Sequence, residues 1–75
     1  SKPHEDVEAR AKVSFSVTET GEVRGIYVLE QAPEGDIGAR VVLFRLLRQL
    51  RFRPVLRQGK AVPYAGLERE YNYQY

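Results

Sequence analysis

The chain has 75 residues, with 43% hydrophobic and 29% charged residues, a net charge of +2 and no cysteine. This length and composition are typical of one globular domain rather than a disordered segment. The lack of cysteine excludes disulfides, thiolate metal sites and a cysteine nucleophile. No apolar run approaches the roughly 20 residues of a membrane span, and no signal peptide is present. Because the chain starts at Ser1 without Met, we expect it to be an excised or processed piece.

The charges are unevenly distributed along the chain. Residues 1–36 contain eight acids and four bases, whereas residues 37–67 contain seven bases and no acid. The basic run in residues 48–63, with Phe52 inside it, is compatible with nucleic-acid binding. It is also compatible with a basic helix and an extended arm that are set beside acidic loops. We favour the second interpretation.

The first half of the chain predicts a β-hairpin. Apolar residues occupy every second position of residues 7–17, which indicates a half-buried strand; they are Val7, Ala9, Ala11, Val13, Phe15 and Val17. Gly21 supplies the positive φ angle of a short hairpin loop. A second strand follows over residues 23–30, and Gly25 within it indicates a bulge or a close approach by a neighbour.

An amphipathic helix is predicted after the hairpin. Asp36 is a suitable N-cap for the periodic segment that follows. One stripe of the helix faces the sheet and consists of Ala39, Leu43, Leu46, Leu47 and Leu50. Apolar residues also lie beyond that stripe, so we expect a flanking segment or a partner to cover them; they are Ile37, Val41, Val42 and Phe44.

The remainder predicts an extended arm and a terminal strand. Pro54 ends the helical region, residues 52–57 form the arm, and residues 57–60 turn the chain. Residues 67–75 alternate between an aromatic and a polar face. The sequence therefore predicts an α+β domain with a small antiparallel sheet of about three strands and one helix packed on one face, in the order β-β-α-β. We expect residues 1–8 to be a partly disordered flank and residues 9–75 to form the domain.

Seven side chains are expected to form the interior, because the strand alternation and the helix stripe select the same core. They are Val13, Phe15, Val17, Leu43, Leu47, Leu50 and Phe52.

Catalytic and metal-binding patterns are missing from the sequence. His4 is the only histidine, and Ser14 and Ser16 have no base nearby in the sequence, so no catalytic triad is assembled. Glu68 and Glu70 share one face of a strand, which is typical of a solvated rim. One histidine and scattered carboxylates do not form a metal-ligand pattern. We expect a protein that is not an enzyme, without a cofactor or metal.

Taken in order, these motifs closely resemble the C-terminal domain of the TonB energy-transducer family, over about residues 9–75. The resemblance depends on a glycine and valine after the first strand, a basic-aromatic-x-Pro signature after the helix, and a Gly-Lys-x-Val-Pro motif. In this chain the residues are Gly21 and Val23; Arg51, Phe52 and Pro54; and Gly59, Lys60, Val62 and Pro63. A terminal strand of alternating aromatics completes the pattern. The chain departs from the family because residues 1–8 lack the Tyr-Pro pair of a region that helps family members to engage the transporter.

The resemblance implies a periplasmic domain, anchored to the inner membrane through a segment absent from this chain. Inner-membrane motor proteins would act on the missing N-terminal parts, and the domain would pass proton-motive work to a TonB-dependent outer-membrane transporter. A transporter peptide would add as a strand to an exposed sheet edge.

We expect the terminal strand to be that edge, so its residues are the candidate partner-binding site: Leu67, Glu68, Arg69, Glu70, Tyr71, Asn72, Tyr73, Gln74 and Tyr75. Two alternatives are that this strand is central, or that it pairs with its copy in a homodimer, as in an envelope assembly module. A third is that the helix surface around Val41, Val42 and Phe44 is the docking site. Nucleic-acid binding, through arginines that include Arg45 and Arg48, is not expected, because the aromatics that could stack on bases lie mainly on the terminal strand.

Overall fold

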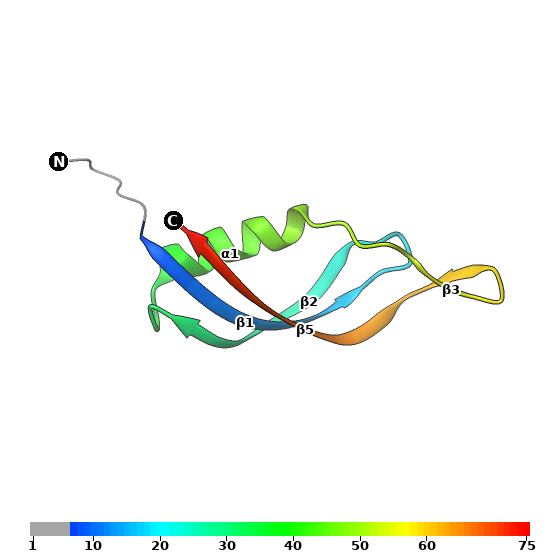
Figure 1. The fold of residues 1–75 in the computed structure, drawn as a ribbon, viewed down its shortest axis with the longest axis horizontal. Coiled ribbons are helices and arrows are strands. Elements are labelled where there is room, and N and C mark those ends of the chain that lie inside the picture. The colour runs from blue at the N-terminus through cyan, green and yellow to red at the C-terminus, as the bar shows by residue number, and fades with distance from the viewer. Residues whose placement is uncertain (1–6) are drawn as a thin grey trace.

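A computed structural model describes residues 7–75 as one helix and five strands (Figure 1). In chain order the elements are β1 (Glu8–Val17), β2 (Val23–Ala32), α1 (Ile37–Gln49), β3 (Val55–Arg57), β4 (Lys60–Val62) and β5 (Tyr64–Gln74). Three strands form an antiparallel sheet in the order β2-β1-β5, and β3 and β4 form a separate two-stranded sheet. The predicted α+β class and the three-stranded sheet with one helix are therefore confirmed.

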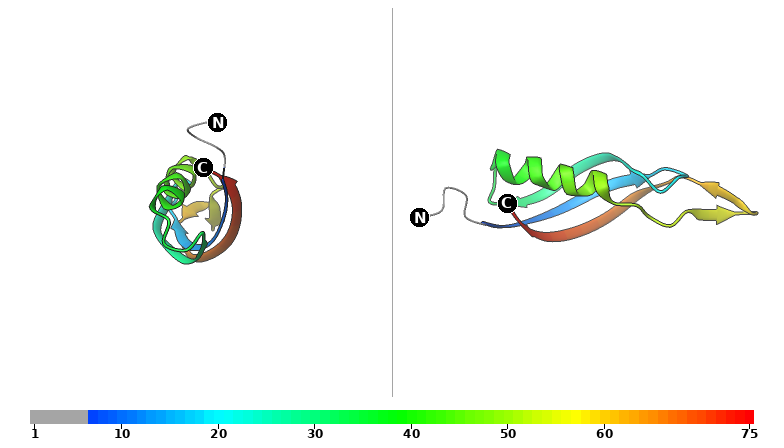
Figure 2. Two further views of the ribbon diagram at one scale, coloured as in Figure 1. Left: turned by 90° about the vertical axis from the view of Figure 1, so that its left-hand side faces the viewer. Right: turned by 90° about the horizontal axis from the view of Figure 1, so that it is seen from above.

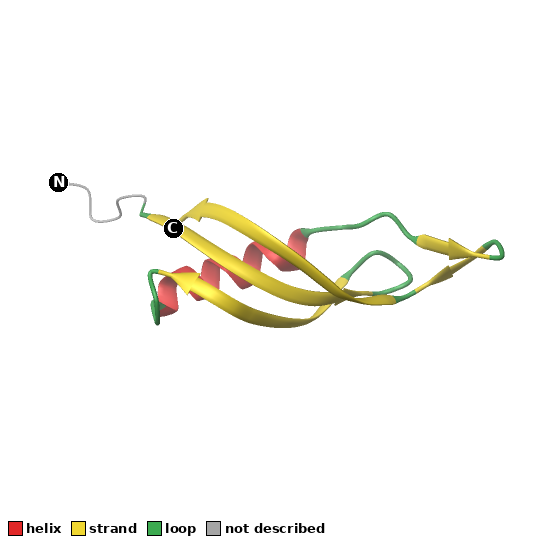
Figure 3. Ribbon diagram, turned by 60° about the horizontal axis from the view of Figure 1, so that its bottom comes forward, coloured by secondary structure: helices red, strands yellow, loops and turns green. Residues whose placement is uncertain are grey.

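The central strand β1 supplies most of the core. Its burial alternates from Ala9 to Val17, as the sequence pattern predicts. The helix α1 lies across one face of the sheet (Figures 2 and 3). The buried residues are Ala9, Ala11, Val13, Phe15, Val17, Val23, Ala39, Leu43 and Leu47. Burial of these apolar side chains is the main source of stability for so small a domain.

The helix begins as the sequence predicts. The Asp36 carboxylate accepts a hydrogen bond of 3.0 Å from the backbone N–H of Ala39, which satisfies a donor that has no partner inside the helix. Leu50 ends the helix in an extended conformation. The chain then returns past the β1–β2 turn, where an isolated bridge joins Arg51 to Glu22.

Strand β2 runs two residues further than predicted and is irregular. Its pairing with β1 shifts once opposite Lys12 and Val13 and again opposite Ser14 and Ser16. The second shift lies near Gly25, which has a φ of 62°, so the bulge predicted there is confirmed.

The segment after the helix is more structured than the predicted arm. Residues 55–57 pair with residues 60–62 around a turn in which Gln58 and Gly59 both have positive φ angles. This geometry is typical of a two-residue hairpin with a type I′ turn. The hairpin β3–β4 projects from one end of the sheet (Figure 1), so the extended segment 52–57 supplies a strand, although not one of the central sheet.

Several core assignments require correction. Leu50 and Phe52 are only half-buried, because both lie where the helix gives way to the arm. Leu46 is 43% exposed at the border of the helix stripe, and Val7 is 45% exposed at the end of the sheet. The expected flank at residues 1–8 lies largely outside the described residues, as does His4, although Glu8 already belongs to β1.

Candidate partner-binding edge

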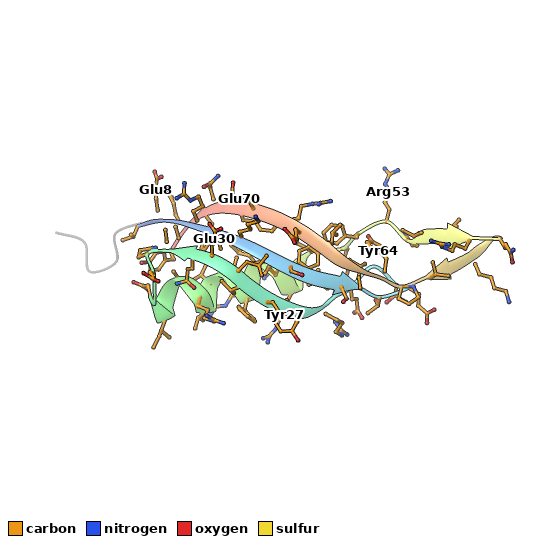
Figure 4. The ribbon with its side chains drawn as sticks, turned by 90° about the horizontal axis from the view of Figure 1, so that it is seen from below. Glu8, Tyr27, Glu30, Arg53, Tyr64 and Glu70 are labelled. Carbon is orange, nitrogen blue, oxygen red and sulfur yellow. The ribbon has the colours of Figure 1, made fainter. Side chains whose placement is uncertain are left out.

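Strand β5 lies at an edge of the three-stranded sheet. It pairs with β1 on one side, and no described strand of the chain pairs with its other side. Figure 4 shows β5, in faint orange to red, on one side of β1, with β2 on the other side. An edge strand of this kind presents unpaired backbone N–H and C=O groups to solvent. The alternative in which the terminal strand is central is therefore wrong.

The hydrogen-bond register identifies which backbone groups of β5 face outward. The N–H of Val7 donates to the carbonyl oxygen of Tyr75 at 3.1 Å, and the N–H of Tyr75 donates to that of Val7 at 3.0 Å. Bonded pairs alternate with unbonded pairs along an antiparallel ladder, and the register continues unbroken from Glu8–Gln74 to Phe15–Leu67. The N–H and C=O groups that point away from β1 therefore belong to Glu68, Glu70, Asn72 and Gln74.

Side chains of β5 form two rows that the register separates. The row on the helix side of the sheet lies opposite the buried residues of β1 and consists of Leu67, Arg69, Tyr71, Tyr73 and, by extension, Tyr75. The outer row consists of Glu68, Glu70, Asn72 and Gln74, opposite the polar residues of β1. Lys12 of β1 lies 4.0 Å from the carboxylate of Glu68, an exposed pair that contributes little to stability. A strand added to β5 would likewise have one row of side chains on the helix side of the sheet and one row on the outer side.

An apolar groove lies between α1 and β5. It has a volume of about 340 Å³, and its walls are Leu43, Leu46, Leu47, Gln49 and Leu50 from the helix side and Tyr71, Asn72 and Tyr73 from β5. Alternate side chains of a strand paired with β5 would point toward this groove, because successive side chains of a strand lie on opposite faces. The sequence places Leu46 and Leu50 in the core stripe and does not predict their role as groove walls.

Two tyrosines at the end of β5 form hydrogen bonds to the start of the helix. The hydroxyl of Tyr73 donates a 2.6 Å hydrogen bond to the carbonyl oxygen of Ala39, and that of Tyr75 donates a 2.8 Å bond to the Asp36 carboxylate. The bonds from Ala39 N–H and from the Tyr75 hydroxyl lower the pKa of Asp36. The same bond to Asp36 is the main cause that raises the pKa of Tyr75, whereas burial raises the pKa of Tyr73. The sequence alone does not predict this contact, which joins residues far apart in the chain.

The other edge of the sheet, formed by β2, is less suited to pairing. Its two register irregularities interrupt the regular spacing of backbone groups, and bulges of this kind are a common protection of sheet edges. Tyr27, on this strand, is 70% exposed (Figure 4). In contrast, β5 is regular from Leu67 to Gln74.

The other expected features lie apart from this edge. Ile37 and Val41 are exposed on the outer side of α1, where they border a shallow hollow of about 310 Å³ with Arg40, Phe44 and Arg48. Ser14 and Ser16 are on the polar face of β1. Residues 7–75 contain no group of three metal-binding side chains, and no helix among them has the length and apolar character needed to cross a membrane.

Comparison with known proteins does not assign the chain to a family. No protein-family model matches the sequence, and no curated protein matches it.

Proposed function

We propose that this domain binds a short extended segment of a protein partner, which adds as a fourth strand to the free edge of β5. The observation that carries the proposal is a regular sheet edge, with outward N–H and C=O groups at four alternate residues, bordered by an apolar groove. Strand addition obtains affinity from main-chain hydrogen bonds and specificity from pockets for alternate side chains. The groove therefore favours a peptide with apolar residues at every second position.

The motif resemblance suggests which system would use this edge. A TonB-like energy transducer would present the domain in the periplasm, tethered to the inner membrane, and the added strand would come from a TonB-dependent outer-membrane transporter. Several hydrogen bonds along one strand would bear the pulling force together. The Tyr73 and Tyr75 bonds to the helix start would transmit that load from β5 to α1.

A backbone substitution tests strand addition directly. Asn72 has an exposed side chain and an outward N–H, and proline is tolerated at such edge positions because only a solvent-facing donor is lost. Asn72→Pro should weaken binding of a transporter-derived peptide about tenfold or more, since one hydrogen bond is lost and the ring blocks close pairing. Asn72→Ala, the matched control, changes the same side chain of the groove wall but keeps the N–H, so it should lose much less affinity than Asn72→Pro.

Isotope-labelled protein titrated with the peptide provides the readout. We expect the largest amide shifts at Glu68, Glu70 and Asn72, with little change at Arg45 on the outer helix face. Equal affinity of the two Asn72 variants, or shifts centred on Val41 and Phe44, would show that strand addition to β5 is wrong. Concentration-dependent dimerisation that Asn72→Pro abolishes would instead identify a second copy of the chain as the strand donor.

A further inference from the structure

A basic hairpin continues the line of β5 beyond the sheet. We define the basic arm as residues 53–63, which contain β3 and β4 and are joined to β5 directly after Pro63. The molecule measures 56 Å along its longest axis and 21 Å along the next, and the arm occupies one end of that axis (Figures 1 and 2). All of β3 is exposed, including Leu56 at 64%. The arm is therefore an open surface next to the proposed binding edge.

The charges of the arm have one sign. It carries Arg53, Arg57 and Lys60, and residues 37–67 contain no acid. None of the ion pairs found within residues 7–75 includes these three side chains. Arg53 projects away from the strands (Figure 4). The three cations thus form a solvated basic surface with little local compensation.

Two acids in the elements next to the arm already pair with other cations. Glu22 is paired with Arg24 at 3.0 Å and with Arg51 at 3.8 Å, at the base of the arm. Glu68 lies 4.0 Å from Lys12, on the outer row of β5. Because none of the ion pairs within residues 7–75 compensates the three cations of the arm, a partner can supply the complementary charge.

We propose that the partner peptide carries an acidic flank, which lies along the basic arm when the adjoining segment pairs with β5. This inference rests on the proposed strand addition and specifies the chemistry of the partner. An extended chain advances about 3.3 Å per residue, so Lys60, four residues before β5, lies about 13 Å beyond the start of that strand. An acidic flank of about four to six residues covers this distance.

A peptide fits the arm better than a nucleic acid does. Residues 53–63 contain no aromatic side chain on which bases could stack, and base stacking supplies much of the affinity for single strands. The arm also continues directly into β5, whose free edge is proposed to pair with the backbone of an extended polypeptide. Charge and position together therefore favour an acidic segment that belongs to the same partner.

Flank exchange tests the inference. Three flanks are compared, in which serine alternates with glutamate, with glutamine or with lysine. Each flank is attached either to the N-terminal or to the C-terminal end of the transporter-derived peptide. Binding is measured by fluorescence anisotropy. The glutamate flank should tighten binding about 3- to 30-fold over glutamine at one end only, because the arm lies at one end of β5 and exposed ion pairs are individually weak. The lysine flank should weaken binding, and about 1 M salt should remove both effects.

Charge-matched variants locate the effect. The triple variant Arg53→Gln, Arg57→Gln, Lys60→Gln should bind the glutamate- and glutamine-flanked peptides equally. The control Arg40→Gln, Arg45→Gln, Arg48→Gln makes the same change in net charge on the helix and should keep the preference.

The outcomes separate this inference from the proposed function. Suppose that the glutamine-flanked peptide binds, but that the glutamate flank does not tighten binding, or tightens it equally at both ends of the peptide. The inference of an acidic flank is then wrong, and strand addition stands. If no peptide binds, both are wrong. Tighter binding of a single-stranded oligonucleotide than of any peptide, lost in the arm variant, would overturn the inference and identify the arm as a nucleic-acid site.

Discussion

Replacement of Gly21 by alanine tests the contact between the first hairpin and the segment that follows the helix. Gly21 has a φ of 87°, and a Cβ atom there would overlap the carbonyl oxygen of Phe52. The N–H of Phe52 also donates a 2.9 Å hydrogen bond to the carbonyl oxygen of Gly21. The Phe52 ring lies 5.6 Å from that of Phe15 in the core. The glycine therefore lets two chain segments approach closely enough to place Phe52.

Three effects contribute to the expected loss. A non-glycine residue in the left-handed region costs about 1–2 kcal/mol. Relief of the overlap would separate the two segments, at a cost of about 0.5–1.5 kcal/mol for the hydrogen bond and a similar amount for the aromatic pair. We expect Gly21→Ala to lower the free energy of unfolding by about 3 kcal/mol. Because a domain of this size is stabilised by only about 4–11 kcal/mol, the midpoint temperature should fall by roughly 15 °C.

Chemical denaturation followed by circular dichroism measures this loss, with Gly59→Ala as the matched control. Gly59 has a φ of 78°, but a Cβ atom there would have no neighbour within 4 Å. The control should therefore show only the conformational cost, about 1 kcal/mol. Equal losses in the two variants would refute the reasoning, because the close approach of Phe52 would then contribute nothing.

Three further predictions concern contacts at the ends of the helix. Phe52→Ala should cost about 2–3 kcal/mol in denaturant melts, less than the 3–5 kcal/mol of a fully buried phenylalanine, because its ring is half-buried; a loss below about 1 kcal/mol would contradict its contact with the core. Tyr75→Phe removes the hydroxyl bond to Asp36, so an NMR titration should show the pKa of Asp36 rising toward its ordinary value. The stabilisation that Asp36 provides is present above its unfolded pKa and is lost as pH falls through its lowered folded pKa, so this loss should occur at higher pH in Tyr75→Phe. Arg48→Ala should cost less than about 1 kcal/mol in thermal melts, because its guanidinium lies 5.9 Å from the Phe44 ring at an exposed site.

The sequence by itself determined the two strands of the first hairpin, the inward row of β1 and the start of the helix. Alternation in residues 7–17 predicts the inward row of β1 because successive side chains of a strand lie on opposite faces. Asp36 predicts the helix start because a carboxylate can accept a hydrogen bond from a free N–H of the first turn. Gly25 predicts a bulge for a similarly local reason. In each case the deciding interaction lies within a few residues of the chain.

Only the tertiary structure decided which strand is an edge and what borders it. Strand order depends on which long-range pairing buries the most apolar surface, and the pattern of residues 67–75 is the same for an edge strand as for a central one with one wet face. The half-burial of Phe52 and the bond between Tyr75 and Asp36 likewise depend on segments that meet only after folding. The groove beside β5 forms where Leu46 and Leu50 on the helix side meet Tyr71 and Tyr73 of the strand, a spatial relation that helix periodicity alone does not encode.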